Sequence, residues 1–287
     1  MTPWTDRAGN FSPLKASVLF AVSLPAIFIL WWAVSGGLGP RPITEAIHQT
    51  GDWAIRILIA TLAVTPLRRI LDWPKLIVVR RMLGVSALFY ALTHLTLYAL
   101  DQKWDLWKVA SEIWLRTYLL IGFTALLGLI ALGLTSFDRS IKALGRNWNR
   151  LHKIVYAIGF LAVIHYFMQT KLDVYQATFL AGLFILLMLY RLAHWRGYDI
   201  AKPLVLASVA IIGTVLTAAA ELLWYATATG VPVGRVFQAN FQFAFQIRPS
   251  WWVLAVGLGM ALIALVLPLV RTKKEPRGRR AAAKAAA

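Results

Sequence analysis

Five histidines and no cysteine limit the metal chemistry open to this chain of 287 residues. Two of the five, His94 and His165, lie inside long apolar segments, where an ionisable side chain is costly and is by default a candidate functional group. Without cysteine there can be no disulfide, no thiolate ligand, no iron–sulfur cluster and no covalently attached c-type haem. Any metal must therefore be held by histidine, methionine or oxygen ligands.

The spacing of these two histidines predicts that they lie at the same depth. His94 follows Arg81, the start of its apolar segment, by 13 residues, and His165 follows Leu151 by 14. At 1.5 Å per helical residue, each side chain lies about 20 Å along a helix, and the two helices run in the same direction. Two imidazoles at one level match the axial positions of a single haem. Iron bound by both would have no open position, which suits electron transfer.

Small residues precede His94 on its own helix face. Gly84, Ala87 and Ala91 lead to His94 at spacings of three, four and three residues, so all four share one side of the helix. Such a face would let a flat macrocycle approach the backbone. The alternative is ordinary packing of small residues between membrane helices. In combination with two histidines at one depth, the face favours haem.

His152 is harder to interpret. It lies 13 residues before His165, which leaves the two about 140° apart around a straight helix unless a π-bulge or a distortion near Gly159 intervenes. The same level of the other histidine-bearing segment holds Arg81. A second, inner haem would thus need an unusual partner. Otherwise His152 caps a loop or bonds a cofactor propionate.

The remaining histidines and a group of arginines have two interpretations each. His48 and His194 are predicted to be solvated residues of an outer and an inner loop. Arg56, Arg68 and Arg69 flank one apolar segment. They either anchor the segment to lipid headgroups or pair with haem propionates or a quinone.

The segments that carry these residues indicate a polytopic membrane protein. Hydrophobic residues make up 59% of the chain and the mean hydropathy is +0.65, far from the composition of a soluble domain. A bilayer-spanning helix needs about 20 apolar residues. Eight segments meet this length, and they are predicted near residues 16–36, 52–70, 82–100, 117–136, 152–169, 174–192, 203–225 and 251–270.

The net charge of +18 follows from the membrane topology, so no nucleic-acid partner is expected. If the N-terminus is inside, 22 of the 30 lysines and arginines lie on the cytoplasmic side. This positive-inside distribution places both termini in the cytoplasm and the loop 226–250 outside, with membrane lipids as partners of the basic loops. The basic residues lie within 7–15, 68–81, 139–153, 191–202 and 271–284.

Three segments carry a family resemblance. TPLRRI (65–70), RRMLGVSALFYALTHLTLY (80–98) and GRNWNRLHKIVYAIGFLAVIHY (145–166) resemble the haem-binding membrane subunit of the periplasmic protein-methionine-sulfoxide reductase system. That family belongs to the ferric-reductase-like transmembrane domains. The resemblance covers about residues 15–195 and implies an all-α, six-helix haem-binding bundle. The last two spans are additional to this pattern.

The expected domain organisation combines this bundle with the rest of the chain. Residues 1–15 form a cytoplasmic arm, 16–197 the ferric-reductase-like haem-binding domain, 198–270 a two-helix transmembrane extension, and 271–287 a basic, disordered cytoplasmic tail. The extension contains one acid that is expected to be buried, Glu221. Its outer loop alternates apolar and polar residues, which predicts a short strand pair or an interfacial segment.

The resemblance also implies cofactors, partners and location. It implies one or two haem b groups, flavin mononucleotide (FMN), and the bacterial inner membrane. Electrons would come from quinol and pass to a soluble periplasmic molybdopterin-containing methionine-sulfoxide reductase, so the subunit itself would not act on methionine sulfoxide. His94, His152 and His165 carry over as haem-linked residues. We add Arg68 and Arg81 as candidate cofactor-binding residues, and a cytoplasmic flavin reductase as a candidate partner.

Two other functions are weaker alternatives. A ferric-chelate reductase or oxidase would need an FAD- and NADPH-binding domain, whereas only 17 residues follow Val270. We therefore expect that alternative to require a separate flavoprotein. A transporter would place paired acids or broken helices at the membrane midplane. The predicted spans are nearly free of acids, with Glu221 as the exception.

Overall fold

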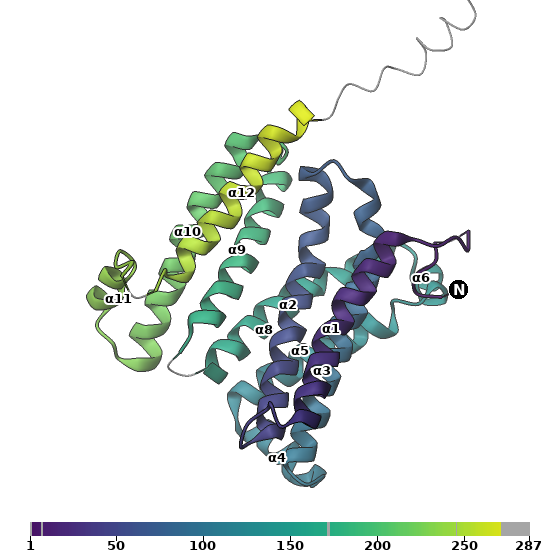
Figure 1. The fold of residues 1–287 in the computed structure, drawn as a ribbon, viewed down its shortest axis with the longest axis vertical. Helices are drawn as coiled ribbons and strands as arrows, with labels where there is room; N and C mark the ends of the chain where they lie inside the picture. The colour runs from purple at the N-terminus through teal and green to yellow at the C-terminus, as the bar shows by residue number, and fades with distance from the viewer. Residues whose placement is uncertain (1, 7, 171–172, 245, 271–287) are drawn as a thin grey trace, which may run out of the picture.

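The computed structural model describes residues 2–6, 8–170, 173–244 and 246–270, and these residues form an all-α protein without a β-strand. The predicted fold class is confirmed (Figure 1). The helices are α1 (Pro13–Ser35), α2 (Pro42–Ile70), η1 (Pro74–Val79), α3 (Arg80–Asp101), α4 (Leu106–Leu115), α5 (Thr117–Leu134), α6 (Asp138–Leu144), α7 (Arg146–Leu151), η2 (His152–Ile154), α8 (Val155–Thr170), α9 (Tyr175–Trp195), α10 (Pro203–Trp224), the π-helical turn η3 (Tyr225–Thr229), α11 (Val233–Ala239) and α12 (Pro249–Val270).

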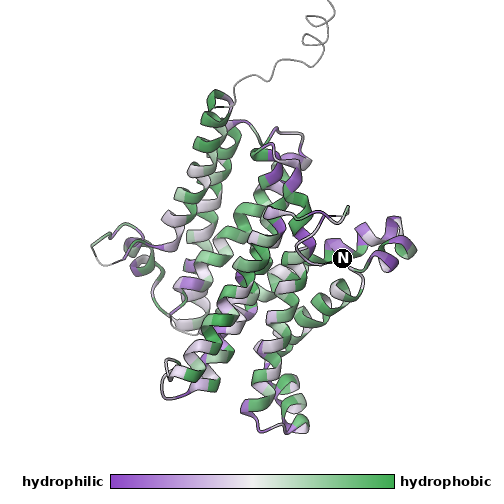
Figure 2. Cartoon of the chain, turned by 45° about the vertical axis from the view of Figure 1, so that its right-hand side comes forward, coloured by the Kyte–Doolittle hydropathy of each residue, from purple (hydrophilic) through white to green (hydrophobic). Residues whose placement is uncertain are grey.

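Seven helices of the described chain are long and apolar enough to cross a membrane, which makes this a multi-pass membrane protein. Their bodies are hydrophobic, and polar residues gather at their ends and in the connections (Figure 2). The remaining predicted span, 52–70, corresponds to α2, which does not meet the same hydropathy criterion. With 29 residues α2 is long enough to span, but its first half carries Gln49, Asp52 and Arg56.

The boundaries of α2 correct the sequence-based interpretation. The span was predicted to begin at residue 52, whereas the helix begins at Pro42, a residue type suited to a first helical turn. The segment that contains His48 is consequently helical and not a loop. His194 is also helical, because it lies in the last turn of α9. Both errors arose because polar residues at a helix end give no membrane-span signal.

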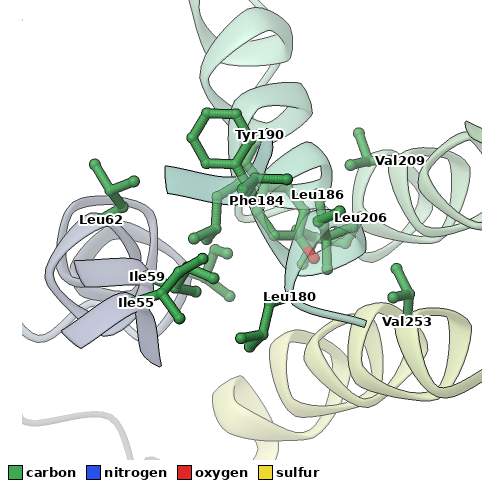
Figure 3. Close-up of a cluster of buried hydrophobic side chains, with 14 of the residues drawn as sticks. Ile55, Ile59, Leu62, Leu180, Phe184, Leu186, Tyr190, Leu206, Val209 and Val253 are labelled. Atoms are coloured by element: carbon green, nitrogen blue, oxygen red, sulfur yellow. The ribbon is translucent and has the colours of Figure 1, made fainter. Parts of the chain in front are cut away.

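The core lies where α2 and α9 meet, and α9 connects the bundle to the C-terminal pair. One buried cluster combines Ile55, Ile59 and Leu62 of α2 with side chains of α9, α10 and α12, including Leu206 and Val253 (Figure 3). Both Leu206 and Val253 are fully buried. α10 and α12 pack against each other and against α9. The two additional helices are thus part of one continuous core.

Of the two structures expected for the connection between α10 and α12, the strand pair is wrong. No strand pair forms within its described residues; the segment contains the short helix α11. A buried polar cluster holds it in place: Glu221 is fully buried and forms an ion pair with Arg248. The Asn240 carbonyl accepts a hydrogen bond from Trp251 Nε1 at 2.6 Å, and the Asn240 side-chain oxygen accepts one from Ser250 at 2.9 Å. These hydrogen bonds provide partners for the backbone carbonyl and the side-chain oxygen of Asn240, which is buried. The predicted disordered tail, 271–287, lies outside the described residues.

Candidate haem site

His94 of α3 and His165 of α8 face each other across a cavity. Their ring centroids are 6.3 Å apart and their planes are nearly perpendicular, at 85°. Both rings line the same cavity, whose volume is about 510 Å³. The structure therefore places side by side the two histidines whose spacing predicted a common depth.

Each imidazole is oriented by a backbone carbonyl of a neighbouring helix. His94 Nδ1 lies 2.8 Å from the Ile47 carbonyl oxygen, and His165 Nδ1 lies 2.7 Å from that of Tyr118. A carbonyl oxygen only accepts, so each Nδ1 must carry the proton and donate. Nε2 is then the unprotonated nitrogen in both rings. A carbonyl on Nδ1 and a free lone pair on Nε2 is the usual arrangement of a metal-binding histidine.

Two glycines make room for the rings. A Cβ atom on Gly51 of α2 would lie 2.9 Å from His94 Nδ1, and one on Gly122 of α5 would lie 2.7 Å from His165 Nδ1. Both distances are shorter than carbon atoms tolerate without a shift of the ring. The absence of a side chain at these positions lets each imidazole reach the carbonyl behind it. α2 and α5 thus support the histidines that α3 and α8 carry.

The cavity wall consists mostly of apolar side chains from four helices. Leu58 of α2, Ala91 of α3, Leu126 of α5 and Ala162 of α8 are among its lining residues. Ala91 fulfils the predicted role of a small residue beside the cavity, but Gly84 and Ala87 do not line it. Ala87 is fully buried in a cluster with α2 residues, and Gly84 faces Thr61 of α2. Those two small residues serve helix packing, which was the alternative interpretation.

The dimensions of the site fit an iron porphyrin. A metal–imidazole bond is about 2 Å long and the ring centre lies about 1 Å behind its nitrogen, so two rings on opposite sides of one iron have centroids roughly 6 Å apart. The observed separation is 6.3 Å. Among the described residues, no group of three or more His, Asp or Glu side chains is arranged to hold a metal. Two histidines therefore suit a macrocycle that supplies the equatorial ligands itself.

Three polar residues of the cavity were missed or misjudged in the sequence analysis. His48, Asp52 and Tyr166 all line it. Tyr166 lies close to Asp52 in the cavity wall. A sequence signal did exist for His48 and Asp52, because residues four apart share a helix face. It became visible only once the helix was known to start before residue 48.

The structure places His152 away from this pair. His152 begins the 3₁₀ turn η2, which precedes α8, and it does not line the cavity. Its ring stacks on Trp148 with centroids 3.9 Å apart, and its Nε2 lies 3.2 Å from Thr135 Oγ1. The break in the helix is thus at residues 152–154, and α8 runs as an α-helix through Gly159. Gly159 instead receives the ring of Phe184.

Neither candidate arginine lines the cavity. Arg68 lies in the last turn of α2, ten residues beyond Leu58, the innermost α2 residue of the cavity wall. Arg81 forms an exposed ion pair with Asp138, with 2.7 Å between nitrogen and oxygen. The structure therefore assigns Arg81 an ionic contact between α3 and α6.

The fold and the cavity define a class: a multi-pass helical membrane protein with two opposed histidines in an apolar cavity. A profile of the ferric reductase like transmembrane component family matches residues 50–164. The protein-methionine-sulfoxide reductase heme-binding subunit MsrQ of Xanthomonas campestris pv. campestris (strain 8004) is 42% identical over 189 residues, which are 63% of this chain and 86% of that protein. The subunit of the same name from Azospira oryzae is 37% identical over 189 residues, 65% of this chain and 79% of that protein. No solved structure matches. The chain belongs to the family of these methionine-sulfoxide reductase membrane subunits.

Proposed function

We propose that this chain is an electron-transfer subunit that holds one haem b between His94 and His165 and supplies electrons to a methionine-sulfoxide reductase. The separation of the two rings carries the proposal, since it matches two axial bonds to one iron. The relatives' names, which describe heme-binding subunits of such a reductase, support it. When bound, the haem would supply one-electron transfer without an open coordination position.

The chain's own residues would bind, orient and shield this group. His94 and His165 would each provide Nε2, while the carbonyls of Ile47 and Tyr118 fix the proton on Nδ1. Such outer bonds hold the ring orientation and raise the basicity of the ligating nitrogen. The apolar wall would exclude water, which favours electron exchange over reactions with solvent.

We further propose the partners of the family for this chain. Quinol would be the electron donor, and a periplasmic molybdopterin-containing methionine-sulfoxide reductase the acceptor that repairs oxidised envelope proteins. FMN is proposed as a second cofactor, with a cytoplasmic flavin reductase as a further partner. Inner-membrane location with both termini in the cytoplasm is supported by the basic segments 68–81 and 139–153.

A visible spectrum of the purified protein tests the haem proposal. The protein in detergent should show low-spin b-type bands that sharpen on reduction with dithionite. The reduced protein should then be reoxidised by the candidate periplasmic reductase in the presence of a methionine sulfoxide substrate. A colourless protein would refute the haem site. A red protein that no such reductase reoxidises would refute only the proposed acceptor.

Fusions to alkaline phosphatase test the orientation, because this enzyme is active only outside the cytoplasm. A fusion after Asn240, in the connection between α10 and α12, should be active, and a fusion at the C-terminus should be inactive. The opposite result would reverse the topology.

A further inference from the structure

A second cavity, of about 320 Å³, lies between α2 and α9 beside the histidine site. Its walls are apolar, with Ile59 and Ala60 from α2 and Phe179 and Leu183 from α9. Two polar side chains complete the lining: Arg56 of α2 and Gln176, the second residue of α9. Ala60 is exposed on its helix, so this groove is open to the surrounding lipid in a membrane. We call it the α2/α9 groove.

Asp52 connects the groove with the histidine cavity. Its carboxylate lies 3.5 Å from Arg56, which lines the groove, whereas Asp52 itself lines the cavity. Asp52 also lies close to Tyr166, the residue next to His165, in the wall of that cavity. An acid, a phenol and a guanidinium thus form one continuous chain from the groove to the helix turn that carries His165.

His48 continues this chain toward the surface. It precedes Asp52 by four residues on α2, so the two side chains share a helix face. Both line the histidine cavity. His48 is exposed whereas Asp52 is only partly accessible. A proton accepted by Asp52 therefore has an imidazole on its way to the aqueous phase.

We propose that the α2/α9 groove binds the membrane hydroquinone that donates electrons, and that Asp52 accepts its protons. This inference rests on the proposed function, in which quinol is the donor. A hydroquinone is a neutral amphiphile: its apolar chain suits Ile59, Phe179 and Leu183, and its hydroxyl groups suit Arg56 and Asp52. A phospholipid headgroup is the weaker candidate, because the carboxylate of Asp52 would repel a phosphate beside Arg56.

The reaction balances with these residues. One hydroquinone gives up two electrons and two protons and becomes the quinone. Each electron would pass to the haem proposed between His94 and His165, which would take up one electron twice for each hydroquinone. The first proton passes from the hydroquinone hydroxyl to the Asp52 carboxylate and on through His48. Asp52 is then ionised again and accepts the second. Tyr166, close to Asp52 in the cavity wall, is the phenol that would position the carboxylate.

The experiment measures reduction of the haem in the full-length, detergent-purified protein by a short-chain hydroquinone such as duroquinol. Ala60→Trp fills the groove from a lipid-exposed position and should raise the half-saturating hydroquinone concentration by about tenfold or more. Ala219→Trp, at an exposed alanine of α10, is the matched control and should behave as the wild type. Asp52→Asn should lower the maximal rate by about tenfold or more and make it rise more steeply with pH, whereas Asp52→Glu should restore most of it.

Dithionite separates the possible failures, because it reduces the haem without the groove. All variants should show the wild-type haem content and full reduction by dithionite. If Ala60→Trp and Asp52→Asn are reduced by hydroquinone as fast as the wild type, the groove assignment is wrong and the quinol donor stands. If the wild type contains haem that hydroquinone does not reduce, the donor and the groove are both wrong. If the wild type contains no haem, the proposed function itself fails.

Discussion

Haem ligands were predicted at two levels of the bundle, that of His94 and His165 and that of His152. The histidines of these two levels differ in their hydrogen bonding. At the cavity level, the Nδ1 atoms of His94 and His165 contact carbonyls, which leaves each Nε2 free to bind a metal. At the level of η2, Nε2 of His152 is the atom that is engaged. The Thr135 hydroxyl donates to the Ala131 carbonyl at 2.8 Å, so it accepts from His152 Nε2 at 3.2 Å. In this arrangement His152 Nε2 carries a proton and offers no lone pair.

The comparison indicates that position along a helix does not by itself make a histidine a ligand. The pair of His94 and His165 combines an opposed partner ring, a glycine behind each imidazole and an apolar cavity. His152 has an indole on one face, from Trp148, and it does not line the cavity. We therefore expect one haem, between His94 and His165, with His152 in a structural role.

Removal of either His94 or His165 should have the largest effect. His94→Ala or His165→Ala deletes one of the two axial bonds, so the low-spin b-type bands should disappear or change to high-spin bands. The absorption spectrum and the haem content per protein measure this. Addition of free imidazole should restore low-spin bands in part, because it fills the vacated position.

His194→Ala is the matched control, since His194 lies in the last turn of α9 and does not line the cavity. Its spectrum should be that of the wild type. A full complement of low-spin haem in both His94→Ala and His165→Ala would refute the ligand pair.

The next largest effect on haem binding should come from a methyl group added at Gly122, behind the His165 ring. In Gly122→Ala, the new Cβ would lie 2.7 Å from His165 Nδ1, so the ring must move off the Tyr118 carbonyl. Overpacking of this kind costs about 1–3 kcal/mol, which should lower haem occupancy several-fold and broaden the low-spin signal. Haem content and electron paramagnetic resonance measure the change. Gly259→Ala on α12 is the control, because nothing lies within 4 Å of its added Cβ. Equal occupancy in the two variants would show that the glycine does not position the histidine.

The two histidines could be predicted from the sequence, whereas the glycines behind them could not. Counting residues from the start of each span placed His94 and His165 at one level, because a helix has a fixed rise. The glycines opposite them could not be found that way. Gly51 and Gly122 lie in helix interiors, and only the packing of four helices shows that a Cβ there would strike an imidazole.

Other residues were misjudged because sequence patterns report the environment of a helix as a whole. The predicted span begins at residue 52, whereas α2 begins at Pro42, because His48 and Gln49 interrupt the apolar run. The structure turns His48 and Asp52 toward the cavity, and Gln49 donates a hydrogen bond to Glu45 of the same helix. For the same reason the role of Asp52 and Tyr166 became visible only when two distant segments were brought together.

His152→Ala should have a smaller effect and of a different kind. The substitution removes the stack on Trp148 and the bond to Thr135, together about 1–2 kcal/mol. The midpoint of thermal unfolding in detergent should fall by a few degrees, while haem per protein and the low-spin spectrum stay at the wild-type level. His152→Phe should recover part of the loss, because a phenyl ring retains the stack. Loss of half the haem with a surviving low-spin signal would instead establish a second, inner haem and overturn the comparison.

Arg81→Gln should have the smallest effect, although Arg81 was a candidate cofactor-binding residue. Its partner Asp138 lies 2.7 Å away, but the two side chains are 47% and 79% exposed. Exposed ion pairs contribute about 0–1 kcal/mol because water and salt screen the charges and ordering both side chains costs entropy. The thermal midpoint should therefore shift by less than in His152→Ala, and the remaining difference from the wild type should vanish at high salt. Haem content and reduction by hydroquinone should not change, because Arg81 lines neither cavity. A clear loss of haem or a shifted reduction potential in Arg81→Gln would mean that the inner level does contact a cofactor, and the contrast between the two levels would no longer hold.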